Sequence, residues 1–256
     1  MRIYEYRTAD PTDDASWSRL ARIIRERRIW CARPTTLNDP HEFAWTCDFT
    51  PTPQTLGVLA GLLQRTKGHT PSEALRRAQV VLTSGAFGSI GRPVIDEMIG
   101  KMRDEIGVAC FGSSPDNPAL WSRYGGEGTG VSVELEVPDG LLGAQLHRVV
   151  YDDNRRIHVE EFIRSMDERD AAIGVYATML TKTKYWQAEE EIRFLSKRPD
   201  IEVRIDGSNV TCVVLGPRVT TAVEAAVRQL ADHIPVVQVD LNGLTSACSR
   251  QRLVRS

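Results

Sequence analysis

The spacing of apolar residues predicts two short strands and one helix at the start of the chain. Ile3, Tyr4 and Tyr6 form an aromatic run that is typical of a strand. Residues 16–28 then carry apolar side chains at helical spacing, with arginines on most of the opposite face and at the end. Residues 29–32 are apolar again and predict a second strand.

Residues 36–43 have the pattern of a helix start. Asp39 can cap the helix, Pro40 fits its first position, and Glu42 can reach back to the cap amide. A purely structural turn accounts for the same residues.

Residues 50–105 are predicted to be helical. Leucines recur at helical spacing early in this region, and Pro71 and Pro93 each open a further helical run. Glycines separate these runs. Because no linker rich in Pro, Ser or Gly isolates the region, we expect a helical insertion within a single domain that covers residues 1–256.

From residue 108 onward the pattern is mostly that of strands. The expected strands are 108–111, 131–137, 146–151, 191–195, 201–205, 210–215 and 236–241, and the expected helices are 159–181 and 221–234. The strands cluster instead of alternating regularly with helices. This order predicts an α+β fold with a mixed or split β-sheet core.

Charge and composition narrow the function classes. The 256 residues include 32 Lys and Arg and 34 Asp and Glu, a formal net charge of −2. Non-specific nucleic-acid binding needs a basic surplus, so we do not expect it. The charged start is unlike a signal peptide, and no apolar run approaches the roughly 20 residues of a membrane helix, so no membrane association is expected.

The cysteines and histidines argue against several kinds of site. The five cysteines are Cys31, Cys47, Cys110, Cys212 and Cys248, and none lies in a Cys-x-x-Cys pair. Neither a disulfide framework nor a zinc site is therefore predicted, and the odd number favours a reducing, cytoplasmic setting. The histidines are scattered and no Gly-x-Ser-x-Gly motif is present, which argues against catalytic zinc and serine hydrolysis.

The densest group of polar side chains lies in residues 182–195. If the end of this segment is extended, a period of two places Glu189, Glu191 and Arg193 on one face and apolar residues on the other. A solvated edge strand is one interpretation. The alternative is a carboxylate pair that stabilises a developing positive charge or binds two hydroxyls of a sugar.

Two other positions are candidates because of their place in predicted strands. Arg7 stands at the end of the first strand, and Ser132 shares a strand face with Glu134 and Glu136. The Gly-rich residues 125–130 lead into a strand instead of a helix, so they are not a phosphate-binding loop of the usual kind.

Several motifs in order resemble the bacterial family called domain of unknown function 2971, over nearly the whole chain. They are Tyr4-Glu-Tyr-Arg7, Leu37-Asn-Asp-Pro-His-Glu42, Cys110-Phe-Gly-Ser113, Asn117-Pro-Ala-Leu-Trp-Ser-Arg-Tyr124, Val150-Tyr151, and the Lys, Trp and Glu-x-Glu-x-Arg residues of 182–193. The chain departs from this pattern at His41, where Phe is usual, and at Arg123, where His is common.

The order of elements also resembles that of ADP-ribosyltransferases. The resemblance implies that Arg7, Ser132 and the acidic run Glu189 to Glu191 face one cleft that binds NAD as a co-substrate. Glu191 would be the catalytic carboxylate, stabilising the oxocarbenium-like ribose at its 2′-hydroxyl, and Glu189 would orient or deprotonate the acceptor.

The same resemblance assigns the remaining residues to NAD binding. Arg7 would hold a phosphate or a ribose hydroxyl, Ser132 would fix the Glu191 side chain, and Tyr124 or Trp186 would stack on the nicotinamide. The expected function is an NAD-consuming transferase or glycohydrolase with a macromolecular acceptor, in a toxin or a phage-defence effector.

Two alternatives remain open. One is a non-catalytic module that binds a nucleotide, another ligand or a protein partner through the same acidic segment. The other is a metal-dependent nuclease in which Asp39, Glu42, Glu189 and Glu191 converge on Mg²⁺.

Overall fold

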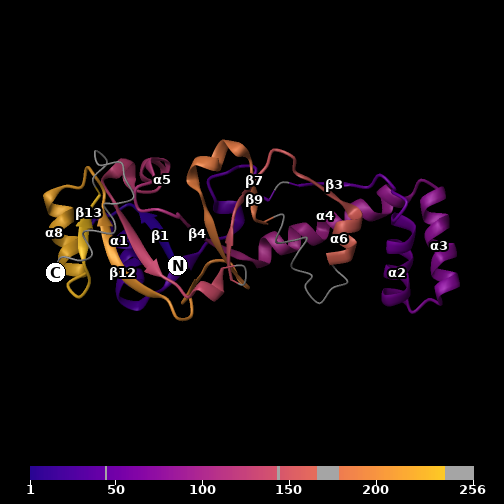
Figure 1. The fold of residues 1–256 in the computed structure, drawn as a ribbon, viewed down its shortest axis with the longest axis horizontal. Coiled ribbons are helices and arrows are strands. Elements are labelled where there is room, and N and C mark those ends of the chain that lie inside the picture. Colours follow the sequence, from indigo (N-terminus) through magenta and orange to yellow (C-terminus); the bar gives the residue numbers. More distant parts are fainter. Residues whose placement is uncertain (44, 143–144, 166–178, 240–256) are drawn as a thin grey trace. The chain divides into compact units, whose positions relative to one another are not determined.

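The computed structural model describes residues 1–43, 45–142, 145–165 and 179–239 (Figure 1). The chain divides into two compact units. Unit 1 comprises Met1–Arg33, Gly107–Val149 and Lys184–Ser256, and unit 2 comprises Pro34–Ile106 and Val150–Thr183.

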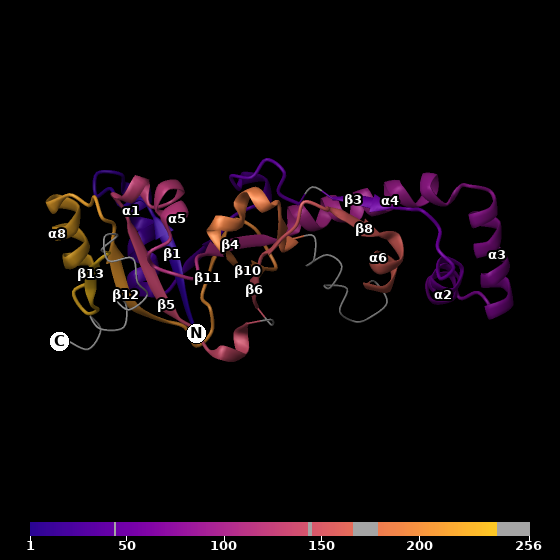
Figure 2. The same ribbon diagram turned by 45° about the horizontal axis from the view of Figure 1, so that its top comes forward.

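Unit 1 contains two main sheets, of which the first is of mixed direction and the second is antiparallel. The first has the order β1 (Arg2–Arg7), β5 (Val131–Glu136), β12 (Asn209–Leu215) and β13 (Val236–Gln238), and the second has the order β4 (Gly107–Phe111), β10 (Ile192–Ser196) and β6 (Leu146–Arg148). All pairs are antiparallel except β12 with β13, and Figure 2 shows β12, β5 and β1 side by side. A further antiparallel pair joins β2 (Ile29–Cys31) to β11 (Ile201–Val203). Together with the helices, these mainly antiparallel sheets are compatible with the predicted α+β class.

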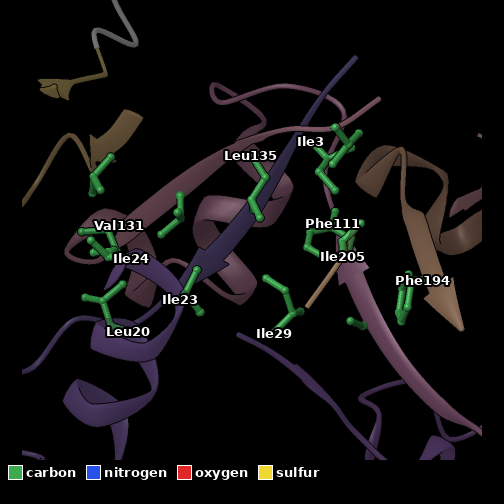
Figure 3. Packing of buried hydrophobic residues seen from close by; sticks show 14 of the residues in the cluster. Ile3, Leu20, Ile23, Ile24, Ile29, Phe111, Val131, Leu135, Phe194 and Ile205 are labelled. Atoms are coloured by element: carbon green, nitrogen blue, oxygen red, sulfur yellow. The ribbon is translucent and has the colours of Figure 1, made fainter. Parts of the chain in front are cut away.

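One apolar cluster joins both sheets of unit 1. The predicted alternation in 131–137 is confirmed, because Val131, Val133 and Leu135 are fully buried in this cluster. Leu20 of α1 (Asp14–Ala21) and Phe194 of β10 belong to it as well (Figure 3). The π-helical turn η1 (Arg22–Glu26) and α8 (Thr221–Leu230) complete the layer on this face.

A smaller cluster covers the opposite face of the first sheet. There Tyr6 packs edge-on against Trp121 of α5 (Pro118–Arg123), with ring centroids 5.0 Å apart. Asn117 caps α5, since its side-chain oxygen accepts from the amides of the second and third residues beyond it. The short 3₁₀ turns of unit 1 are η3 (Gly126–Gly128), η4 (Asp139–Leu141) and η5 (Lys184–Glu189).

Unit 2 is mainly helical, as predicted for residues 50–105. Its elements are η2 (Pro34–Thr36), β3 (Thr46–Asp48), α2 (Thr55–Lys67), α3 (Pro71–Thr83), α4 (Phe87–Glu105), β7 (Val150–Tyr151), β8 (Arg156–His158), α6 (Val159–Ser165) and β9 (Thr181–Lys182). Helices α2 and α3 pack side by side, and β3 with β8 and β7 with β9 form two parallel pairs. Pro71 opens α3, as the sequence indicates, and the Thr70 side chain caps the helix.

Two helix predictions need correction, and a third is described only in part. Helix α4 begins at Phe87, so Pro93 lies inside it, and Gly91 packs against Phe49 instead of breaking the helix: a Cβ at Gly91 would lie 2.6 Å from Phe49 Cε1. Residues 36–43 form no helix beyond η2, because Asp39 Oδ1 accepts from the His41 amide at 2.8 Å within a local turn. Of the helix expected over 159–181, α6 covers the start, and 166–178 lie outside the described residues.

Candidate functional site

The acidic run 189–191 does not form one extended strand face. Glu189 ends the 3₁₀ turn η5, Glu190 has a left-handed backbone (φ 47°), and β10 begins only at Ile192. Asn117 Nδ2 donates to the carbonyls of Ala188 at 2.8 Å and Glu189 at 3.4 Å, and these bonds hold the segment in a turn. The expectation that Glu189 shares a strand face with Glu191 and Arg193 is therefore wrong.

Glu191 and Arg193 form a buried ion pair at the start of β10, a strand that lies between β4 and β6, so the interpretation of this segment as a solvated edge strand is wrong. Arg193 Nε lies 2.7 Å from Glu191 Oε1, and Arg193 Nη2 lies 3.3 Å from Oε2. The Arg193 side chain is 0% exposed and the Glu191 side chain is 4% exposed. Both carboxylate oxygens thus meet the guanidinium fork, an arrangement that fixes the start of β10.

The neighbours of Arg193 across the second sheet are Cys110 on β4 and His147 on β6. Directly paired residues of antiparallel strands share a face, so these three side chains lie on the face opposite the apolar core. Burial lowers the pKa of His147, which keeps its imidazole neutral at pH 7.

Glu189 is held by residues of the segment around α5. Its Oε1 atom accepts from Arg123 Nη1 at 3.2 Å and from the Tyr124 hydroxyl at 3.1 Å, and the carboxylate is 1% exposed. The Arg123 guanidinium also lies over the ring of Trp186, 4.8 Å from its centroid. Tyr124 and Trp186, predicted to stack on nicotinamide, therefore both take part in the packing around Glu189.

Arg7 and Ser132 are placed on opposite faces of the first sheet. The register pairs Ser132 with Tyr6 and Arg7 with Val131, and neighbouring residues of a strand point to opposite faces. Arg7 pairs with Glu5, whereas Ser132 is fully buried and its hydroxyl makes no hydrogen bond within the described chain. The expectation that Arg7 and Ser132 face one cleft is therefore wrong.

The structure instead exposes Glu190 and Tyr185, and the surface formed by Ser113, Arg123, Tyr185, Trp186 and Glu190 is called here the Tyr185–Glu190 surface. Glu190 is exposed, and its Oε2 atom accepts from the Ser113 hydroxyl at 2.8 Å. Tyr185 is 76% exposed and its ring contacts that of Trp186 edge-on, with centroids 5.4 Å apart. The positive φ of Glu190 is costly for a non-glycine residue, and residues of this kind cluster at functional sites.

The run of three glutamates at 189–191 is the one sequence signal for this arrangement. Of three consecutive glutamates, the flanking two are buried and paired with arginines, and the middle one is exposed. The buried Glu189 and Glu191 therefore hold the turn on which the exposed Glu190 carboxylate lies. Which of the three takes the exposed position depends on the turn, which a strand pattern does not predict.

The residues of the nuclease alternative are distributed over both units. Asp39 and Glu42 belong to unit 2, and Glu189 and Glu191 to unit 1. Asp39 is buried, with Arg155 Nη2 3.7 Å from its Oδ2 atom. Among the described residues, no group of three or more His, Cys, Asp or Glu side chains is arranged to hold a metal ion.

The described helices include none that is both long and apolar enough to cross a membrane. Comparison with protein-family models, with curated proteins and with solved structures finds no match in any of the three.

Proposed function

We propose that unit 1 binds a nucleotide-type ligand, with NAD and ADP-ribose as the first examples, at the Tyr185–Glu190 surface. The observation that carries this proposal is the exposed Glu190 carboxylate, held between two buried, arginine-paired glutamates and close in the chain to the exposed ring of Tyr185. The support is the chemistry of these side chains.

Each part of a nucleotide has a matching group on this surface. An exposed aromatic ring such as Tyr185 offers a stacking platform for a base. A carboxylate such as Glu190 accepts hydrogen bonds from ribose hydroxyls. The guanidinium of Arg123 has five donors, and only Nη1 donates to Glu189, so the same group is suited to a phosphate.

The burial of Glu189 and Glu191 argues against a catalytic role for these two carboxylates and favours a ligand-binding function. A catalytic carboxylate must touch the ribose whose charge it stabilises. Glu191 is 4% exposed and Glu189 is 1% exposed, and each is paired with an arginine. Their arrangement favours holding the turn that carries Glu190.

The second candidate is an NAD-consuming ADP-ribosyltransferase or glycohydrolase in which Glu190 stabilises the oxocarbenium-like ribose. The left-handed backbone of Glu190 (φ 47°) favours this candidate, because strain of this kind persists where a side chain must be presented in a fixed direction. It differs from the sequence-based expectation in the identity of the carboxylate.

Thermal unfolding of the full chain with NAD, ADP-ribose, AMP and ribose 5-phosphate tests the proposal. A ligand at 100 times its Kd adds about 2.7 kcal/mol, or roughly 5–10 °C in Tm for a chain of this size. Glu190→Gln and Tyr185→Ala are expected to abolish the shift. Glu127→Gln is the matched control, because Glu127 is also exposed with a positive φ of 55°.

Nicotinamide release in the same samples separates the two candidates. A shift without turnover supports binding alone, and release that depends on Glu190 supports the transferase or glycohydrolase. No shift with any of the four ligands contradicts both candidates.

A further inference from the structure

Unit 2 contains a pocket that neither the acidic run nor the Tyr185–Glu190 surface involves. It has a volume of about 520 Å³ and lies between residues of β3 and the N-terminal part of α4. This volume falls in the range of roughly 300–1,000 Å³ typical of small-molecule sites. Its lining includes Asp48, Phe49, Gly88, Arg92 and Arg156.

Two arginines from different elements line this pocket. Arg92 comes from the second turn of α4, and Arg156 comes from β8, where it pairs with Thr46 of β3. Both are exposed, and within the described residues neither guanidinium makes a hydrogen bond or an ion pair. Two guanidinium groups at a pocket whose lining contains one carboxylate, Asp48, leave an excess of positive charge that is favourable for an anionic ligand.

Glycines in α4 allow the apolar wall of the pocket to lie close to the helix. The Phe49 ring lies against Gly88 and Gly91, and Arg92 Cζ stacks 5.1 Å from the ring centroid. Gly85 also lines the pocket, and a Cβ placed there would meet no atom within 4 Å. The pocket therefore combines fixed positive charge with an aromatic wall.

The acidic group that faces the same space is already engaged. Asp48 Oδ1 accepts from the Thr50 amide at 2.9 Å, and this bond lowers the pKa of Asp48, which stays ionised at neutral pH. Asp48 is in register with His158, whose Nε2 atom lies 2.8 Å from the Thr50 carbonyl. The two arginines outweigh the single carboxylate at the pocket wall.

We propose that this pocket binds a small organic phosphate, with the phosphate between Arg92 and Arg156 and the organic part against Phe49. The N-terminal end of α4, a helix of 19 residues, adds a favourable dipole toward the pocket residues Gly85 and Gly88. The volume exceeds what a bare phosphate fills, so the ligand carries a carbon skeleton. This site is independent of the proposed function of unit 1.

Isothermal titration of the full chain with phenyl phosphate tests this inference, with phenol and inorganic phosphate as separate arms. We expect saturable binding of phenyl phosphate to one site per chain, weaker binding of inorganic phosphate, and none of phenol. Arg92→Gln and Arg156→Gln should each weaken binding about ten-fold or more.

The control variant is Arg76→Gln, an exposed arginine on α3 that does not line the pocket. It should leave the Kd within about two-fold. Glu190→Gln should also leave it unchanged, so that failure here is distinguishable from failure of the proposed function. The inference is overturned if phenyl phosphate does not bind, if phenol binds equally well, or if Arg76→Gln weakens binding as much as the pocket variants.

Discussion

Replacing Glu191 by glutamine tests whether this carboxylate is a structural anchor. The change keeps the shape of the side chain but removes the charge opposite Arg193, which is 0% exposed. Removing one partner of a buried ion pair costs about 3–5 kcal/mol, because the other charge stays buried without its counter-ion. The amide still offers one acceptor in place of the two contacts at 2.7 and 3.3 Å, so we expect a loss near the lower end, about 3 kcal/mol.

The assay is scanning calorimetry with urea unfolding followed by circular dichroism. For a chain of this size, about 3 kcal/mol corresponds to a fall in Tm of roughly 6–12 °C. The matched control is Glu136→Gln at an exposed position of β5, which should shift Tm by less than about 2 °C. The double variant Glu191→Leu with Arg193→Met should recover much of the loss, since replacing a buried pair by apolar residues is often neutral. A Glu191→Gln protein that melts like the wild type would refute the anchoring role.

Three further predictions concern pH, thiols and backbone strain. Burial raises the pKa of Cys212 from 9.0 to about 12, so above pH 9 the unfolded chain releases a proton that the folded chain retains. The free energy of unfolding, measured in urea, should therefore fall as pH rises above 9, and less steeply in Cys212→Ala. Cys110 is exposed whereas Cys31, Cys47 and Cys212 are buried, so mass spectrometry after brief alkylation should find Cys110 modified first among these four; rapid labelling of a buried thiol would contradict the fold. Glu127→Gly relieves a left-handed residue and should raise the unfolding free energy by about 0.5–1 kcal/mol, with an unchanged or lower value counting against strain at this position.

The features predicted correctly from the sequence are those set by local patterns. The alternation in 131–137 places the buried valines without knowledge of the partner strands, and Pro71 gives the start of α3. The pattern likewise places Ile192 and Phe194 on the core side of β10, because residues two apart in a strand share a face.

The features predicted wrongly depend on contacts distant in the sequence. Asn117 binds the carbonyls at the end of η5, and no local pattern predicts that this bond turns the acidic run. The order of elements predicts that Arg7 and Ser132 share one cleft, whereas their faces follow from the β1–β5 register. The glycine pattern predicts a helix break at Gly91. Its close packing against Phe49 is a tertiary contact, which the local sequence does not reveal.

The central claim is that Glu190 is the ligand-facing carboxylate and that Glu189 and Glu191 hold it in place. Isothermal titration of ADP-ribose into the wild type and into Glu190→Gln tests this claim most directly, with Glu127→Gln as the control. The account predicts that Glu190→Gln weakens binding about ten-fold or more without lowering Tm by more than about 2 °C, while the control binds like the wild type. Equal affinity of Glu190→Gln and wild type, or no binding of ADP-ribose by the wild type, would contradict it.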